Sequence, residues 1–157
     1  MTAFLSAAML VAASSCSKDE TVAEPLAVTY ASISGTWTLM ELNGSPIDGD
    51  SIYRYLVIGR KADEETGDRP FEFWQNLNSD KSEYRSGTYI LGTEDESGNP
   101  AITGTFDHAA GDWSDDYIIT DFTETSMTWT GYRFGNVYKY VRCDSVPEDI
   151  QAGTRSL

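Results

Sequence analysis

The feature that most constrains the fold of this chain is a succession of eight short strand-like runs, each followed by a turn-rich break. No stretch keeps the period of 3.6 residues that an amphipathic helix requires. Breaks such as Asn43-Gly44 and Asp48-Gly49 carry residue pairs that favour tight turns. The runs span residues 36–42, 52–58, 70–76, 86–92, 101–107, 116–122, 126–132 and 136–143. This pattern predicts an all-β domain.

Short connections between successive strands favour antiparallel neighbours, because a parallel pair needs a long crossover. An open sheet of eight strands would expose two edges, whereas closing the sheet into a barrel removes both. We therefore expect residues 33–145 to form a single eight-stranded, antiparallel, up-and-down barrel. Such a barrel is either filled by side chains or wide enough to hold one small ligand. A two-sheet sandwich with Greek-key connections is the alternative architecture.

The N-terminal segment is typical of a targeting signal rather than of a folded element. Residues 1–15 carry no charged side chain, and their apolar stretch has the length of a signal peptide rather than of a membrane span. Small residues then lead to Cys16, and the polar tract of residues 17–20 follows it. This order resembles the lipobox of bacterial lipoproteins, in which the leader is cut before a cysteine that becomes lipidated. The polar tract is similar to the export signal of surface lipoproteins of Bacteroidota.

The resemblance implies lipid attachment at Cys16 and a location at the outer membrane or cell surface, with the membrane as a partner. Residues 16–32 are then the lipidated cysteine and a flexible tether, and residues 146–157 are a C-terminal tail. A buried N-terminal helix that contains a cysteine by chance is the alternative interpretation of the first segment.

The chain is strongly acidic, with 25 Asp and Glu against 11 Lys and Arg and a formal net charge of −14. The sequence carries no basic cluster of the kind that binds phosphate backbones, so we expect no nucleic acid partner. Net acidity supports solubility, but it does not indicate a fold.

One short motif opens the first strand, and a basic residue lies in the last. Gly35, Thr36 and Trp37 form a Gly-x-Trp sequence, and Arg142 lies in the run of residues 136–143. This pair resembles the lipocalins and related calycins, whose barrel begins with Gly-x-Trp and whose last strand supplies a basic residue that packs across the tryptophan. The resemblance implies that Gly35, Trp37 and Arg142 close one end of the barrel, with the cation over the indole face.

A second stretch strengthens this resemblance. Residues 87–129 are similar to the lipocalin-like domains of small Bacteroidota lipoproteins. The shared marks are Gly87-Thr88-Tyr89, Ile102-Thr103-Gly104, Trp113, Tyr117-Ile118-Ile119, Thr125 and Met127-Thr128-Trp129. Altogether the resemblance covers residues 33–143.

Strand alternation then predicts which side chains face the interior, once Trp37 and Arg142 are placed inside. Each such residue either packs in the core or lines a ligand cavity. The candidates for lining a cavity are Leu39, Phe71, Phe73, Tyr89, Leu91, Ile102, Phe106, Met127, Trp129, Tyr138 and Tyr140.

Residues that could carry catalysis are few. His108 is the only histidine, and no nucleophile elbow of the form Gly-x-Ser-x-Gly accompanies it. Cys143 and His108 could in principle form a thiol pair, but a small hydrophobe near the seam of the barrel is the simpler interpretation of Cys143. We therefore expect no enzyme and no catalytic residue.

Two loops, residues 94–99 and 107–116, concentrate carboxylates that could in principle hold calcium. Neither loop has the ligand spacing of an EF-hand, and acidic turns are common on a protein of this charge, so we expect no metal and no cofactor. The triplets that begin at Asp50 and Asp144 resemble an O-glycosylation sequon of exported Bacteroidota proteins.

These observations predict a non-catalytic, lipid-anchored lipoprotein whose barrel binds a small amphipathic or hydrophobic ligand. The first alternative is a filled barrel that serves as an interaction subunit or inhibitor and contacts a protein of the envelope. The second alternative is an enzyme of unrecognised type. A ligand pocket should lie at the end opposite Trp37 and Arg142, where Tyr and Trp side chains suit an amphipathic ligand and an acidic rim disfavours anions.

Overall fold

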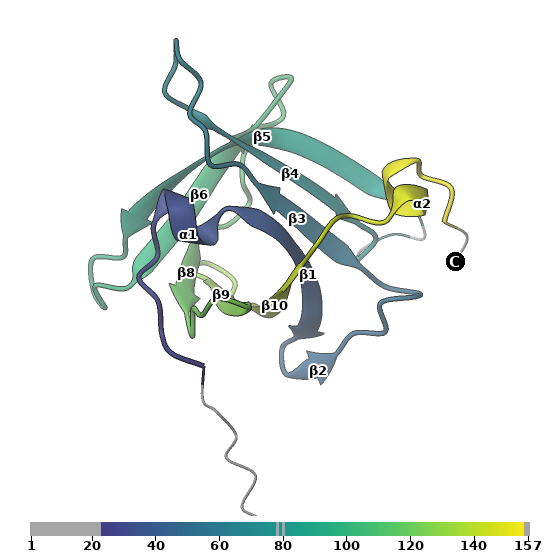
Figure 1. The fold of residues 1–157 in the computed structure, drawn as a ribbon, viewed down its shortest axis with the longest axis horizontal. Helices are drawn as coiled ribbons and strands as arrows, with labels where there is room; N and C mark the ends of the chain where they lie inside the picture. The colour runs from purple at the N-terminus through teal and green to yellow at the C-terminus, as the bar shows by residue number, and fades with distance from the viewer. Residues whose placement is uncertain (1–22, 78, 80, 156–157) are drawn as a thin grey trace, which may run out of the picture.

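Eight strands form a closed antiparallel barrel, as the alternating pattern predicts. A computed structural model describes residues 23–77, 79 and 81–155. Cys16, the predicted signal segment and the first part of the predicted tether lie outside these residues. The barrel strands are β1 (Gly35–Leu42), β3 (Arg54–Ile58), β4 (Arg69–Gln75), β5 (Glu83–Thr93), β6 (Pro100–Phe106), β8 (Tyr117–Thr120), β9 (Ser126–Gly131) and β10 (Val137–Cys143) (Figure 1).

Four shorter elements accompany the barrel. β2 (Ser45–Pro46) folds back on β1, and β7 (Gly111–Asp112) pairs with the end of β6. The helix α1 (Tyr30–Ile33) precedes the first strand, and α2 (Glu148–Gln151) follows the last. Neither of these helices has the length and apolarity that crossing a bilayer requires.

The order of pairing is that of a simple meander. Each barrel strand pairs with its neighbours in the sequence, and β10 returns to pair with β1. The register places Trp37 opposite Arg142 on one side and opposite Leu56 on the other. A bulge at Met40 shifts the register of β1 and keeps Leu42 opposite Tyr138. The closed order excludes the two-sheet alternative.

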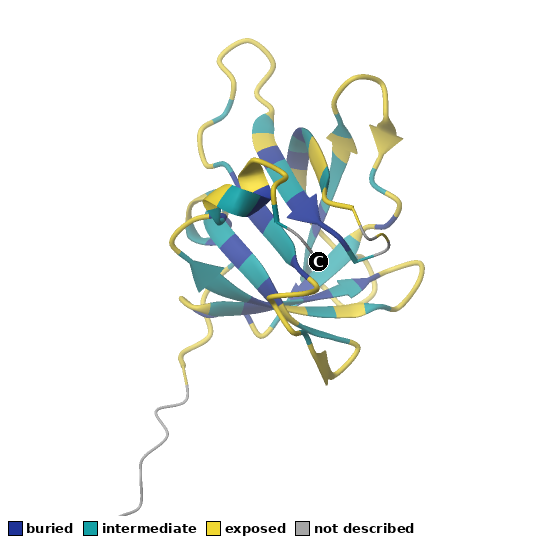
Figure 2. Ribbon diagram, turned by 90° about the vertical axis from the view of Figure 1, so that its right-hand side faces the viewer, coloured by how far each residue is buried: buried dark blue, intermediate teal, exposed yellow. Residues whose placement is uncertain are grey.

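Strand alternation divides the side chains into an inner and an outer set, as the striped burial in Figure 2 shows. The inner set forms one continuous apolar core, while the connections are exposed. The fully buried members of the core are Ile33, Trp37, Leu39, Leu56, Ile58, Phe71, Tyr89, Ile102, Ile119, Phe122, Met127, Trp129 and Tyr140.

The helix α1 closes one end of the barrel. Thr29 caps it through a reciprocal hydrogen-bond pair with Ser32, which is why four residues suffice for a helical turn. Ile33 is completely buried in the core, and Tyr30 packs on Tyr89 with ring centroids 5.8 Å apart. The Tyr30 hydroxyl also accepts a hydrogen bond from the backbone N–H of Leu91 at 3.1 Å. The segment therefore acts as a plug.

The residues that follow the last strand return to the outside of the barrel, where α2 lies in Figure 1. Val146 and Ile150 pack on Tyr53 and Trp74, which belong to the outer face near β3 and β4. Arg155 pairs with Asp149 at 2.6 Å and holds the end of the segment. The sequence predicted only a tail for residues 146–157. The described part of this segment instead contributes Val146 and Ile150 to a second, smaller apolar cluster with Tyr53 and Trp74.

Candidate functional site

A cavity of about 480 Å³ opens inside the barrel, at the end away from α1. The end of β4, the start of β5, the β6–β8 connection and the β9–β10 turn surround its mouth. This is the end at which the sequence placed a pocket. The lining residues are Arg54, Leu56, Phe71, Phe73, Gln75, Glu83, Arg85, Phe106, Asp112, Trp113, Ser114, Asp115, Tyr117, Trp129, Phe134, Asn136, Tyr138 and Tyr140.

The opposite end is sealed by the predicted contact between Arg142 and Trp37. The Arg142 guanidinium lies 4.1 Å from the Trp37 ring, and the indole N–H donates to the carbonyl of Ile33 at 2.9 Å. Arg142 also donates to three backbone carbonyls, those of Ser32, Ser34 and Glu124, at 2.8–2.9 Å. The arginine therefore joins the entry of the first strand to the loop before β9.

Gly35 is required by the same contact. Its φ of 132° belongs to a backbone conformation that is energetically unfavourable for residues other than glycine. A Cβ at this position would also collide with the Arg142 guanidinium. The Gly-x-Trp motif is thus explained by the arginine that lies over both residues.

An aromatic wall lines the other, open end. Trp113 lies 4.4 Å from Phe71 between ring centroids, and Tyr117 lies 5.3 Å from Trp129. Trp113 comes from a connection rather than a strand, and it reaches the interior by crossing Gly104, where a Cβ would strike the indole. β6 and β8 pair over only two residues on each strand. Trp113 fills the gap between these two strands beyond the paired residues.

One cation projects into this aromatic space. Arg54 alternates with Leu56 and Ile58 along β3 and therefore faces inward. Its Nε donates to Oε1 of Gln75 at 2.7 Å, and its Nη1 lies 3.5 Å from the Tyr140 hydroxyl. Its guanidinium carbon stands 4.8 Å from the centre of the Tyr138 ring. Among the described residues, Arg54 has no carboxylate within ion-pair distance.

The acidic side chains of the lining are held by other partners. Glu83 pairs with Arg85 at 2.6 Å and accepts a hydrogen bond from the Gln75 amide at 2.6 Å. Both oxygens of Asp115 accept backbone N–H groups of the β9–β10 turn, from Arg133 at 2.7 Å and from Phe134 at 3.1 Å. Gln75 therefore stands between the Glu83 carboxylate and the Arg54 guanidinium.

The electrostatics keep Arg54 charged and its tyrosines neutral. Burial opposes the charged guanidinium, but the hydroxyls of Tyr140, Tyr138 and Tyr117 outweigh it and raise the pKa of Arg54. Burial likewise raises the pKa of Tyr117 and Tyr140 well above that of a free phenol. At neutral pH, the cavity thus contains a fixed positive charge among protonated hydroxyls.

Two further hydrogen-bond donors of the lining are left without an acceptor in the described part of the chain. The buried indole Nε1 atoms of Trp113 and Trp129 have no hydrogen-bond partner among the described residues. Buried polar groups are usually paired, so unpaired donors of lining residues are an unusual feature of this site.

The cavity gathers six of the eleven residues that were candidates for lining it, namely Phe71, Phe73, Phe106, Trp129, Tyr138 and Tyr140. The other five pack in the core instead. These are Leu39, Tyr89, Leu91, Ile102 and Met127.

The residues considered for catalysis lie apart from the cavity lining. His108 is exposed in the turn after β6, with a φ of 59°, and Cys143 ends β10 opposite Thr36. Burial raises the pKa of the Cys143 thiol, and the adjacent Asp144 raises it further. No group of three His, Cys, Asp or Glu side chains in the described part of the chain could hold a metal ion.

Arg54, Gln75 and Trp113 are among the twelve lining residues that the sequence did not indicate as cavity residues. A signal for Arg54 existed, because strict alternation puts it on the same face as Leu56 and Ile58. The general expectation that barrel interiors are apolar argued against placing a charged side chain such as Arg54 there. Trp113 carried no such signal, since it lies outside the strand pattern.

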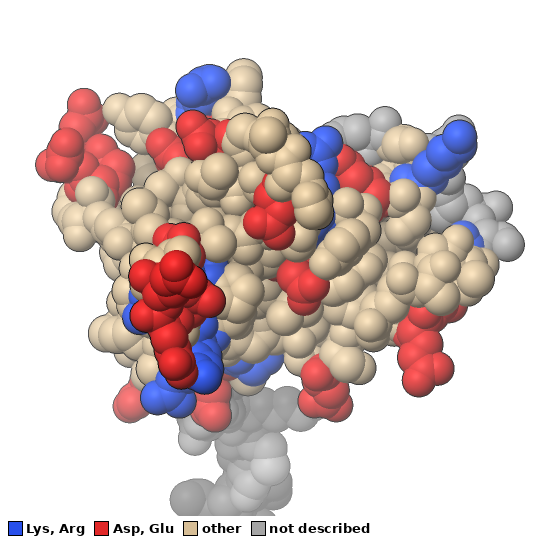
Figure 3. Space-filling model, turned by 90° about the horizontal axis from the view of Figure 1, so that it is seen from above, with Lys and Arg blue, Asp and Glu red and all other residues tan. Residues whose placement is uncertain are grey.

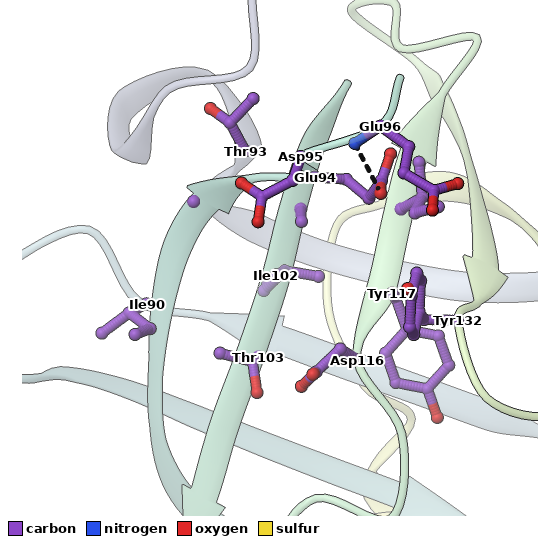
Figure 4. Close-up of a pocket in the computed structure, with 13 residues that line it drawn as sticks. Ile90, Thr93, Glu94, Asp95, Glu96, Ile102, Thr103, Asp116, Tyr117 and Tyr132 are labelled. Carbon is purple, nitrogen blue, oxygen red and sulfur yellow. Dashed lines mark hydrogen bonds between the residues drawn. The ribbon is translucent and has the colours of Figure 1, made fainter. Parts of the chain in front are cut away.

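A second hollow, of about 430 Å³, lies on the outer surface between the β5–β6 hairpin and the start of β8 (Figure 4). Exposed Ile90 and Tyr132 flank it, and its rim carries Glu94, Glu96 and Asp116. Acidic side chains are also scattered across the face drawn in Figure 3, with basic side chains between them.

The fold and the cavity define this chain as an eight-stranded antiparallel barrel with one sealed end and one open end. Comparison with protein-family models, with curated protein sequences and with solved structures gives no match.

Proposed function

We propose that this chain is a lipid-anchored envelope protein of the lipocalin-like kind, which binds a small amphipathic ligand inside its barrel and catalyses no reaction. The observation that carries the binding function is the open cavity of about 480 Å³ with a largely aromatic wall. Ligand pockets have volumes of about 300–1,000 Å³. The cavity has such a volume, and its wall combines aromatic rings with polar and charged side chains, as an amphipathic ligand requires.

A binding function rather than catalysis is supported by the chemistry of the reactive side chains. A thiol is nucleophilic as its thiolate, and burial together with Asp144 raises the pKa of Cys143. His108 lies on an exposed turn away from the cavity lining. The cavity itself offers tyrosine, indole, amide and guanidinium groups, which suit recognition.

A dye that fluoresces on burial tests the binding function. The neutral dye N-phenyl-1-naphthylamine should bind the full chain with a Kd on the order of micromolar, as is usual for a small apolar ligand. Ser114→Trp at the mouth should weaken this binding about tenfold by obstructing the cavity. Ser97→Trp, on the exposed β5–β6 turn, is the matched control and should leave the affinity unchanged.

The same titration distinguishes the leading proposal from its alternative. If the wild type takes up no dye and Trp129→Ala does, the interior is full in the native protein. The function would then belong to the outer surface, where the hollow beside Ile90 and Tyr132 is the natural candidate for a protein contact.

The anchor is tested separately from the barrel. Metabolic labelling with a fatty-acid analogue should mark the wild type, and Cys16→Ala should abolish the label. Ser17→Ala, next to the modified position, should remain labelled. A wild type that stays unlabelled would contradict the anchor and the proposed location, without bearing on the cavity.

A further inference from the structure

The charge inside the barrel constrains which ligands can occupy the cavity. A guanidinium has five N–H donors. Only two of those of Arg54 meet an acceptor among the described residues, one from Nε to Gln75 and one from Nη1 to the Tyr140 hydroxyl. The remaining donors, including both of Nη2, have no acceptor there. Arg54 lines the cavity and its side chain is partly exposed there.

The nearby carboxylates do not supply the missing acceptors. Glu83 is engaged by Arg85 and by the Gln75 amide, and each oxygen of the Asp115 carboxylate accepts a backbone N–H group. Arg54 is therefore the cation of the cavity whose charge is not directly paired in the described part of the chain. Its position is rigid, because Gln75 orients Nε and the Tyr138 ring packs against the guanidinium plane.

We infer that the cavity selects ligands that carry an anionic oxygen group, such as a carboxylate or sulfonate, on an apolar aromatic body. Arg54 binds the anionic oxygens through its unpaired donors, and the rings of Phe71, Trp113 and Trp129 pack against the body. An arginine fork matches two oxygens of one oxyanion, which makes this contact directional as well as charged. The inference deepens the proposed binding function and rests on it.

This specificity revises an expectation from the sequence. The acidity of the chain suggested that anions would be disfavoured at the mouth. Of the three acidic side chains of the lining, however, Glu83 is paired with Arg85 and Asp115 accepts from backbone amides, while Asp112 is exposed and accepts from the Thr105 hydroxyl. The charged group that remains available to a ligand inside the cavity is the Arg54 guanidinium, which is positive.

Two dyes with the same ring system test the inference. 1-Anilinonaphthalene-8-sulfonate differs from N-phenyl-1-naphthylamine by one sulfonate, so the ratio of their affinities isolates the anionic group. The full wild-type chain should bind the sulfonate at least about tenfold more tightly, as expected for a charge-assisted contact. Arg54→Met should abolish this preference, and continued binding of the neutral dye would show that the variant has kept its cavity.

Further variants separate charge from geometry. Arg54→Lys should keep part of the preference, because it keeps the charge and loses the fork. Arg60→Met, which removes an exposed arginine outside the cavity lining, should leave the preference intact. Equal affinities of the wild type for both dyes would overturn the inference while the binding function stood. Failure of both dyes to bind would overturn the two together.

Discussion

Arg142 shows how one side chain can set the geometry of a whole end of the barrel. Its guanidinium covers the Trp37 ring, excludes any Cβ at position 35 and donates to the carbonyls of Ser32, Ser34 and Glu124. We expect Trp37→Ala to lower the free energy of unfolding by about 3–5 kcal/mol, as for a large buried aromatic residue. Arg142→Ala should lower it by about 2–3 kcal/mol through the lost charged hydrogen bonds and ring contact.

The two losses should not be additive, because each variant removes the same contact. Urea unfolding of both single variants and of the double variant forms a cycle that measures the coupling. We expect a coupling of about 1 kcal/mol. Strict additivity would mean that the two side chains act independently, and the closure of the barrel would need another explanation.

Tyr89 gives the molecule a sensitivity to alkali. Burial raises the pKa of Tyr89 to about 12, and its hydroxyl donates to the carbonyl of Gly59 at 2.8 Å. The fold thus favours the neutral phenol, so the stability from this group is complete below about pH 10 and is lost as the pH rises toward 12. The loss should be on the order of 2 kcal/mol. Urea midpoints measured from pH 8 to 12 should fall less steeply in Tyr89→Phe, and an unchanged slope would rule Tyr89 out as the cause.

Among the elements, α2 contributes stability although it lies outside the barrel. Ile150 is 1% exposed in the cluster with Tyr53 and Trp74. We expect Ile150→Ala to cost about 2–4 kcal/mol in the free energy of unfolding. Glu148→Ala, on the exposed side of the same helix, should change it by less than about 0.5 kcal/mol. Equal effects of the two substitutions would mean that the helix does not dock on β3 and β4.

The barrel strands were predictable because their inner positions alternate with polar ones, and this pattern survives in a single sequence. Each observed strand lies within a few residues of its predicted run. The two-residue strands β2 and β7 are too short to have a period. The four-residue helices α1 and α2 lie below the length at which a helical pattern can be seen, and tertiary packing holds them.

The site was less predictable than the fold, for a physical reason. The aromatic wall follows from alternation, so Phe73, Trp129 and Tyr138 could be named in advance. Arg54 breaks the rule that charges avoid interiors, and Trp113 reaches the cavity from a connection through the space left at Gly104. Alternation alone places Arg54 inside, whereas the position of Trp113 depends on where the pairing of β6 with β8 stops, which a single sequence does not encode explicitly.

At the scale of the whole molecule, the sealed end and the open end determine how a ligand can arrive. The plug of α1 and the Arg142 contacts close one end, so entry must occur past the β6–β8 connection and the β9–β10 turn. A ligand with an anionic group therefore approaches a strongly acidic protein and meets its attractive partner only inside. Long-range and short-range electrostatics act in opposite directions along this path.

This opposition predicts an unusual dependence on salt. The net charge of −14 repels an anionic ligand over distances that salt screens, since the Debye length falls from about 30 Å at 0.01 M to about 8 Å at 0.15 M. The contact with Arg54 acts at close range inside the cavity and is screened much less. Raising NaCl from about 0.01 to 0.15 M should therefore strengthen the binding of 1-anilinonaphthalene-8-sulfonate several-fold. The affinity for N-phenyl-1-naphthylamine, measured in the same titrations, should stay nearly constant because that dye is neutral. A sulfonate affinity that falls with salt would place the dye on exposed basic side chains of the surface rather than on the arginine inside the barrel.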